Sequence, residues 1–190
     1  MKYIAKSAAV LACAVISAIG PFSLAEAQAG WFDKESDEPA LCKANTDESE
    51  ILWFARILYS ETKDANEMRL VAWVVRNRVE TGYRGNTYET VAKSRNQFSG
   101  LSPADSNYKI NTTLDYDDTH PAWKKALATA EEVFYASEDE RPFAQNVRHF
   151  YSPVSVSSRP SWIHSGDLAL VVPSSTPNGA ARFEFYSGVK

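Results

Sequence analysis

The sequence predicts an α+β fold that is mainly helical, with a small antiparallel β-sheet toward the C-terminus. Over residues 47–94 and 119–135, apolar side chains recur at helical spacing, and candidate capping residues precede several of these stretches. After Pro142 the pattern changes to short runs that are rich in β-branched and aromatic residues. Helices followed by strands in this order are typical of an α+β architecture.

The composition excludes several classes of protein. Of the 190 residues, 44% are hydrophobic and 23% are charged, so disorder, collagen and coiled coil do not describe the chain as a whole. A formal net charge of −4 argues against a protein that binds nucleic acid or anionic membranes mainly through charge. The two cysteines form neither a disulfide framework nor a zinc motif with the histidines. We expect no metal ion and no cofactor.

The first 29 residues have the pattern of a secretory signal peptide. Lys2 and Lys6 precede an apolar run at residues 8–19, and two Ala-x-Ala cleavage sites lie within residues 25–29. The run is shorter than the ~20 residues that span a bilayer, so we expect no membrane span after cleavage. A lipobox ending at Cys13 is the alternative. Export predicts a location in the periplasm or the cell wall, and the remaining ~160 residues suit one domain.

The exported chain is expected to begin with a flexible acidic lead at residues 30–46, followed by one domain at residues 47–190. Asp47 and Glu50 form a candidate capping box for the first helix. The apolar stripe of this helix runs to Glu61.

The second helix is expected to begin at a capping box of Asp64 and Glu67 and to end at Gly82. A short helix follows at residues 87–94, and the polar residues 95–118 predict a long surface loop. A further helix is expected from Pro121, which suits a first helical position. The predicted strands are residues 147–151, 168–172 and 181–186.

Glu61 lies on the buried stripe of the first helix, in line with Phe54 and Leu58. An ionised carboxylate is costly there unless it is paired, stays protonated or lines a cleft. The last two conditions describe a general acid, because burial raises the pKa of a carboxyl group. Alternatively, Glu61 reaches solvent at the helix end or pairs with Lys63 or Arg56. Spacing alone leaves both interpretations open.

The second helix carries an amide, Asn77, on an otherwise apolar line. A buried amide must be hydrogen-bonded. Asn77 therefore either holds a loop backbone in place or orients the Glu61 carboxyl and the substrate. The neighbouring Arg78 is expected to form a salt bridge or to clamp a carbonyl group rather than to bind a ligand.

Three segments together resemble one known family. Residues 50–79 contain Glu-Ile-Leu-Trp-Phe-Ala-Arg-Ile-Leu-Tyr-Ser-Glu-Thr and then Leu-Val-Ala-Trp-Val-Val-Arg-Asn-Arg-Val. The segments Gln97-Phe98-Ser99 and His149-Phe150-Tyr151-Ser152-Pro153 follow in the same order as in that family. This arrangement resembles the SleB-type cell wall hydrolases, the spore cortex-lytic enzyme family, over about residues 48–188.

The resemblance implies a lysozyme-like domain that cleaves peptidoglycan glycan strands between N-acetylmuramic acid and N-acetylglucosamine. It implies that Glu61 is the catalytic acid of a lytic transglycosylase, an enzyme that leaves a 1,6-anhydromuramoyl end. The chain departs from the family where Ala-Arg-Gly-Glu follows the catalytic glutamate, because residues 62–65 are Thr-Lys-Asp-Ala. Glu67 is close enough in sequence to be considered for the role of the missing glutamate.

The number of carboxylates bears on the reaction. A hydrolase normally needs a second carboxylate as nucleophile or base, whereas a transglycosylase needs one, because the C6 hydroxyl of the substrate attacks. The loop offers Asp105, Asp115, Asp117 and Asp118 as second carboxylates, but none lies in a motif, so the transglycosylase is favoured. The side chains expected to bind substrate are Tyr59, Asn77, Phe98, Ser99 and Tyr151.

Other functions stay open at this point. A non-catalytic peptidoglycan-binding or scaffolding protein would use the same fold, and a hydrolytic muramidase or an amidase would act on the same wall. A metal-dependent amidase needs closely spaced ligands, but His120, His149 and His164 form no His-Glu-x-x-His motif. A serine hydrolase is disfavoured because Gly-x-Ser-x-Gly is absent. We expect a monomer whose partner is the glycan strand of peptidoglycan.

Overall fold

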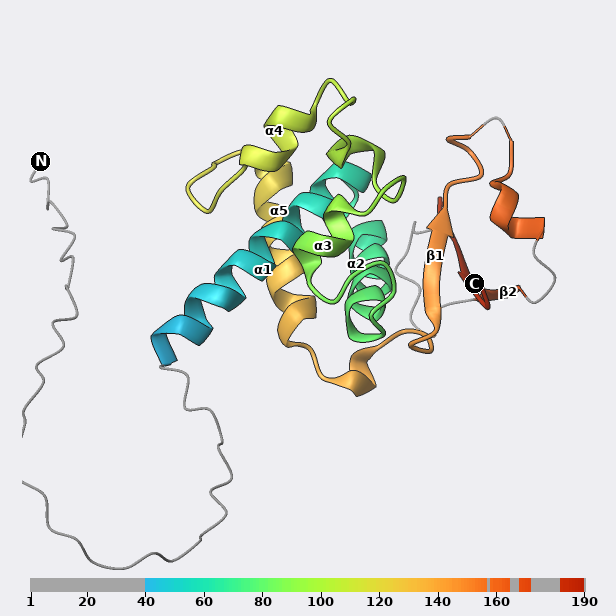
Figure 1. The fold of residues 1–190 in the computed structure, drawn as a ribbon, viewed down its shortest axis with the longest axis horizontal. Helices are drawn as coiled ribbons and strands as arrows, with labels where there is room; N and C mark the ends of the chain where they lie inside the picture. The colour runs from blue at the N-terminus through green and yellow to red at the C-terminus, as the bar shows by residue number, and fades with distance from the viewer. Residues whose placement is uncertain (1–39, 157, 165–167, 172–181, 190) are drawn as a thin grey trace, which may run out of the picture. The chain divides into compact units, whose positions relative to one another are not determined.

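The computed structural model of this chain describes residues 40–156, 158–164, 168–171 and 182–189 (Figure 1). The predicted signal peptide and residues 30–39 of the predicted lead lie outside this part of the chain. The elements are α1 (Ala40–Glu61), α2 (Ala65–Glu80), α3 (Tyr88–Lys93), η1 (Ser99–Leu101), α4 (Tyr108–Thr113), α5 (Pro121–Tyr135), η2 (Glu138–Glu140), β1 (Val147–Tyr151), η3 (Ser161–His164), β2 (Ala169–Val171) and β3 (Glu184–Ser187).

Helix α1 begins at Ala40, so the prediction that Asp47 caps it is wrong. Alanine and leucine at residues 40, 41 and 44 are strong helix formers, and they extend the helix into the residues assigned to the flexible lead. The predicted apolar stripe is confirmed further along the helix, because Phe54 and Leu58 are fully buried. The helix ends at Glu61.

The start and the end of α2 follow the predicted signals. Asp64 is the N-cap, and its side chain accepts hydrogen bonds from the backbone N–H groups of Asn66 and Glu67. The reciprocal half of the capping box is absent, because the Glu67 carboxylate accepts a hydrogen bond from Thr62 Oγ1 instead, at 2.8 Å. Beyond the helix end, Gly82 has a φ of +64°, a left-handed conformation that glycine adopts readily.

Helices α1, α2 and α5 pack together around the main hydrophobic core. Helix α5 begins at Pro121, as predicted, and lies beside α1 (Figure 1). Its Trp123 is fully buried, and the indole Nε1 donates a hydrogen bond to the carbonyl oxygen of Asp115 at 2.7 Å. This bond ties the segment before α5 to the core.

The prediction of a continuous loop over residues 95–118 is wrong, because this segment contains η1 and α4. Helix α4 has six residues and no apolar stripe, so periodicity gave no signal for it. Asn111 of α4 donates a hydrogen bond to the carbonyl oxygen of Gly100 at 2.8 Å. A Cβ atom at Gly100 would lie 3.0 Å from Cβ of Ser60, so η1 is held tightly against the end of α1.

The three strands form an antiparallel sheet in the order β1-β3-β2, with Phe150 opposite Phe185. Strand β1 has the predicted bounds, and it packs against α2. The α+β fold class and the small antiparallel sheet toward the C-terminus are thus confirmed. Within the described ranges, no helix has the length and apolar character needed to cross a membrane.

Candidate active site

Glu61 is the last residue of α1, at the corner where residues 62–64 connect α1 to α2. The stripe that buries Ile57 and Leu58 completely leads to Glu61 one turn later. Because the helix ends there, the Glu61 side chain is half-buried rather than enclosed. The carboxyl group therefore lies at the edge of the core.

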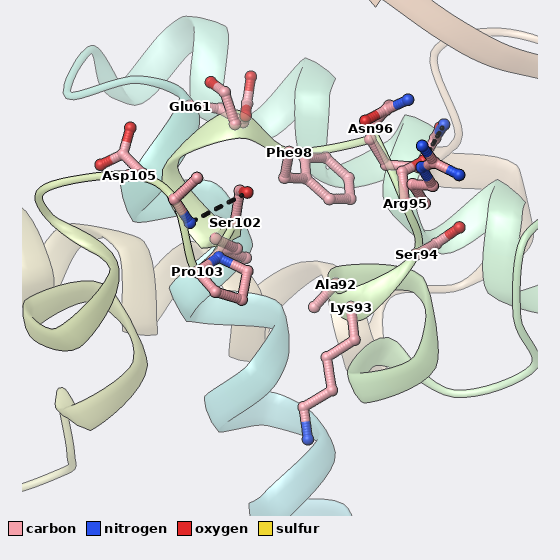
Figure 2. Close-up of a pocket in the computed structure, with 14 residues that line it drawn as sticks. Glu61, Ala92, Lys93, Ser94, Arg95, Asn96, Phe98, Ser102, Pro103 and Asp105 are labelled. Carbon is pink, nitrogen blue, oxygen red and sulfur yellow. Dashed lines mark hydrogen bonds between the residues drawn. The ribbon is translucent and has the colours of Figure 1, made fainter.

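Two cavities meet at Glu61. The larger, here called the loop cavity, has a volume of about 870 Å³ and is lined by Glu61, residues 92–99 and residues 101–105. Figure 2 shows Glu61 and Asp105 on the side of this cavity away from Lys93. The smaller, here called the sheet cavity, has a volume of about 340 Å³ and is lined by Glu61, Arg78, Gln97, Ser99, residues 150–152, Ser155, Val156, Arg182 and Phe183.

A third cavity, here called the corner cavity, has a volume of about 410 Å³. Its lining consists of Tyr59, Ser60, Lys63, Ser99, Gly100, Asp105, Asn107, Ile110 and Asn111. It shares Ser99 and Asp105 with the loop cavity, which in turn shares Glu61, Gln97 and Ser99 with the sheet cavity. The three cavities therefore adjoin one another, with Glu61 at the junction of two of them.

The Glu61 carboxyl has the electrostatic character of a general acid. Burial raises its pKa from 4.5 to about 7, while the positive charge of Arg78 acts in the opposite direction. Among the described residues, no side chain or backbone group forms a hydrogen bond or an ion pair with this carboxyl. Glu61 is therefore available to give a proton to a ligand near neutral pH and to take one back.

Arg78 is a buried cation in the wall of the sheet cavity. Its Nε donates a hydrogen bond to the carbonyl oxygen of Arg148 at 2.7 Å, which matches the carbonyl clamp, one of the two structural roles expected for Arg78. The guanidinium carbon lies 5.2 Å from the ring centroid of Phe98 and 6.0 Å from that of Phe150. Burial lowers the pKa of Arg78 to about 10, which leaves it charged at neutral pH.

Four of the residues expected to bind substrate line these cavities. Tyr59 lines the corner cavity, Phe98 the loop cavity and Tyr151 the sheet cavity, while Ser99 lines all three. Phe98 and Tyr151 are 3% and 7% exposed, so each presents only a small part of its ring to a cavity. Contact of these four side chains with substrate stays a prediction.

Asn77 lies in the core and lines none of the three cavities. Its side-chain amide donates hydrogen bonds to the carbonyl oxygens of Val147, at 2.8 Å, and Ala144, at 3.3 Å. Its side-chain oxygen accepts a hydrogen bond from Arg141. Of the two roles that the sequence left open, this geometry matches the one in which Asn77 holds a backbone segment in place.

The acidic residues considered as second carboxylates are spread over different places. Asp105 shares the loop cavity with Glu61. Glu67 is buried beneath the corner, where its carboxylate accepts the bond from Thr62 and lies 4.0 Å from Nη1 of Arg182. Asp115, Asp117 and Asp118 line none of the three cavities. Asp105 is therefore the second carboxylate that the structure brings to the same cavity as Glu61.

Sequence reasoning did not place Gln97, Arg78 and Arg182 at the site. Gln97 belongs to the Gln97-Phe98-Ser99 segment, which resembles the family. Its position next to Phe98 and Ser99 could have marked it as a site residue. Arg182 immediately precedes the segment that leads into β3. No sequence pattern marked it as a site residue, because only the pairing of β3 with β1 brings it to the sheet cavity. In the part of the chain that the structure describes, no three His, Cys, Asp or Glu side chains gather as a metal site would require.

Comparison with known proteins identifies a family. A family model described as Cell Wall Hydrolase matches residues 62–172, which is more than half of the chain. The matched segment begins one residue after Glu61 and includes α2, the loop cavity and β1. No curated protein and no solved structure gives a significant match.

Proposed function

Since this chain belongs to the cell wall hydrolase family, we propose that it cleaves peptidoglycan glycan strands as a lytic transglycosylase. Glu61 is the general acid and then the general base of this reaction. The observation that carries the proposal is the position of a half-buried carboxyl, with no hydrogen-bond partner among the described residues, at the junction of two cavities. A glycosidic bond that lies over Glu61 would have one sugar in each cavity.

The reaction needs one protein carboxyl. Protonated Glu61 gives its proton to the glycosidic oxygen, and the bond from that oxygen to C1 of the muramoyl residue breaks. The C6 hydroxyl of the same muramoyl residue attacks C1, and its proton passes to the Glu61 carboxylate. The products are a 1,6-anhydromuramoyl end and a free 4-hydroxyl on the neighbouring N-acetylglucosamine, and Glu61 regains its starting proton.

The surroundings of Glu61 support both halves of this cycle. Burial raises the pKa of Glu61 to about 7, so the protonated form is available near neutral pH. After the first proton transfer Glu61 carries a negative charge, which the positive charge of Arg78 stabilises. The carboxyl is therefore suited to acting as an acid first and as a base second.

A hydrolytic muramidase is the second candidate, and Asp105 is the observation that favours it. Asp105 lines the loop cavity together with Glu61, so a carboxylate is available to activate water or to act as a nucleophile. The two reactions differ in their products, because hydrolysis leaves a reducing end and transglycosylation leaves an anhydro end.

Mass spectrometry of the soluble muropeptides released from purified sacculi tests the proposal, with the Glu61→Gln variant run in parallel. We expect 1,6-anhydromuramoyl products from the unchanged protein and a near absence of products from the variant. Reducing ends would identify a hydrolase. Intact glycan from both proteins, with binding to sacculi retained, would identify a non-catalytic peptidoglycan-binding protein.

A further inference from the structure

The sheet cavity has two cationic side chains in its lining, in addition to Glu61. Arg78 and Arg182 both line it, and the Arg182 side chain is 47% exposed. The nearby carboxylate of Glu67 offsets part of the charge of Arg182, from which it is 4.0 Å away. With Glu61 protonated, the charges around the cavity leave a net positive site.

One buried donor in the wall of this cavity has no acceptor among the described residues. Nη1 of Arg78 is buried, and no described residue forms a hydrogen bond with it. Buried polar groups in proteins almost always have a partner. An unpartnered guanidinium N–H in the wall of a cavity therefore indicates a ligand that accepts hydrogen bonds.

The second cation is held at the rim by its neighbours. Nη2 of Arg182 donates a hydrogen bond to Oγ of Ser155 at 3.1 Å, and that hydroxyl donates to Oγ of Ser152 at 3.0 Å. Ser152 is buried, so the chain of bonds anchors Arg182 to the segment that follows β1. The hydroxyl groups thus position the cation, and Glu67 offsets only part of its charge.

The loop cavity has a more balanced set of charges. Its Lys93 forms an ion pair with Glu89, and the rest of its lining includes one exposed cation, Arg95, and one carboxylate, Asp105. An anionic group is therefore favoured in the sheet cavity over the loop cavity.

We infer that the sheet cavity binds a carboxylate carried by the muramoyl residue of the substrate, through Arg78 and Arg182. This inference rests on the proposed function. In a glycan strand the muramoyl residue alone carries carboxylates, either on its lactyl group or on the attached stem peptide, whereas N-acetylglucosamine is neutral. The carboxylate therefore fixes the direction of the strand, with the muramoyl residue in the sheet cavity and N-acetylglucosamine in the loop cavity.

Calorimetric binding to the Glu61→Gln protein, which holds the substrate uncleaved, tests the inference. The probes are a GlcNAc-MurNAc tetrasaccharide with free lactyl carboxylates, its methyl ester, and the same tetrasaccharide with L-Ala-D-Glu stems. We expect at least one carboxylate probe to bind about tenfold more tightly than the ester at low salt. Tighter binding of the free acid alone assigns the lactyl group, and tighter binding of the stem-bearing probe alone assigns the peptide.

Variants in the same background identify the cation. Arg182→Gln should remove the advantage of the carboxylate while leaving the affinity for the ester unchanged, and Arg182→Lys should keep most of that advantage. Lys125→Gln is the matched control, because Lys125 is exposed on α5, carries the same charge and lines none of the cavities. Thermal unfolding of each variant checks that it is folded.

Two results would overturn the inference. Equal affinity for the ester and both carboxylate probes would show that no anion site exists, and an equal loss for all probes in Arg182→Gln would show that Arg182 only maintains the fold. If the probes bind alike while the unchanged protein still releases anhydro products, the inference fails and the proposed function stands. If no probe binds and no product is released, both fail.

Discussion

Glu61 and Arg78 line the same cavity, and the charge of Arg78 lowers the pKa of Glu61, yet the two groups form no ion pair. The guanidinium Nε is committed to the carbonyl oxygen of Arg148 instead. A direct ion pair would hold Glu61 ionised and remove its proton at neutral pH. Because the two groups form no ion pair, the effect of burial on the pKa of Glu61 exceeds the effect of the Arg78 charge. The pKa of Glu61 is therefore raised to about 7.

Replacing Glu61 by glutamine should reduce the release of muropeptides at least ~10²-fold, because the amide cannot transfer a proton to the leaving oxygen. The shape of the side chain is retained, so binding to sacculi should change little. Turbidity loss of a sacculus suspension measures the rate, and sedimentation with sacculi measures the binding. Activity within a few-fold of the unchanged protein would remove Glu61 from the mechanism.

The same substitution should stabilise the fold at alkaline pH. The pKa of Glu61 is about 7 in the folded protein and 4.5 as the ordinary value, so the unfolded chain loses this proton first as pH rises. Protonated Glu61 therefore makes its full contribution to the free energy of unfolding below pH 4.5, and this contribution is lost as pH rises to about 7. Glu61→Gln should therefore be more stable than the unchanged protein by about 2 kcal/mol at pH 8 and similar to it at pH 4. Urea unfolding at both pH values measures this, and a difference independent of pH would contradict it.

Local signals were enough to predict much of the fold. Asp64 marks the start of α2, and Gly82 lies just beyond its end. Both positions could be predicted because an N-cap and a left-handed glycine act within one turn of the helix end. Glu61 was singled out by its place on an apolar stripe, since helical periodicity places i and i+4 residues on one face. The start of α1 was misplaced because Asp47, a good capping residue, lies inside a helix that stronger helix formers extend.

What the sequence could not predict depends on distant segments. Arg182 reaches the sheet cavity because β3 pairs with β1, a contact between segments far apart in the chain. Asn77 left two roles open for the same reason, since its hydrogen-bond partners lie before and within β1. The charge of the sheet cavity is thus a property of the tertiary structure rather than of a motif.

The pH dependence of activity should reflect the charge of Arg78. The rate kcat/KM should fall above about pH 7 as Glu61 loses its proton. Removing the positive charge in Arg78→Met should move this decline to higher pH. Burial raises the pKa of Glu61, and the charge of Arg78 would no longer lower it. Arg78→Lys keeps the charge and should leave the decline near pH 7. Rates across pH 5–9 test this, and identical profiles for all three proteins would show that Arg78 does not act on Glu61.

Asn77→Ala should destabilise the protein by about 2–3 kcal/mol, because it removes three hydrogen bonds of a fully buried side chain, two to the carbonyl oxygens of Val147 and Ala144 and one from Arg141. If Asn77 only holds β1 in place, kcat/KM of the folded variant should stay within a few-fold of the unchanged protein. Asn146→Ala is the control, since Asn146 is exposed and should change stability by less than ~0.5 kcal/mol. Urea unfolding gives the stability. A large fall in kcat/KM for a folded Asn77→Ala protein would instead support a role in binding substrate.

Asp105→Asn separates the two reactions that the loop cavity can accommodate. In a transglycosylase the C6 hydroxyl attacks and no second carboxylate takes part, so the variant should retain more than about a tenth of the rate and still give anhydro products. Asp117→Asn is the control, because Asp117 is exposed and lines none of the cavities. Product analysis and initial rates with sacculi measure both effects. If the unchanged protein gives reducing ends and Asp105→Asn loses as much activity as Glu61→Gln, Asp105 acts with Glu61 as the second carboxylate of a hydrolase.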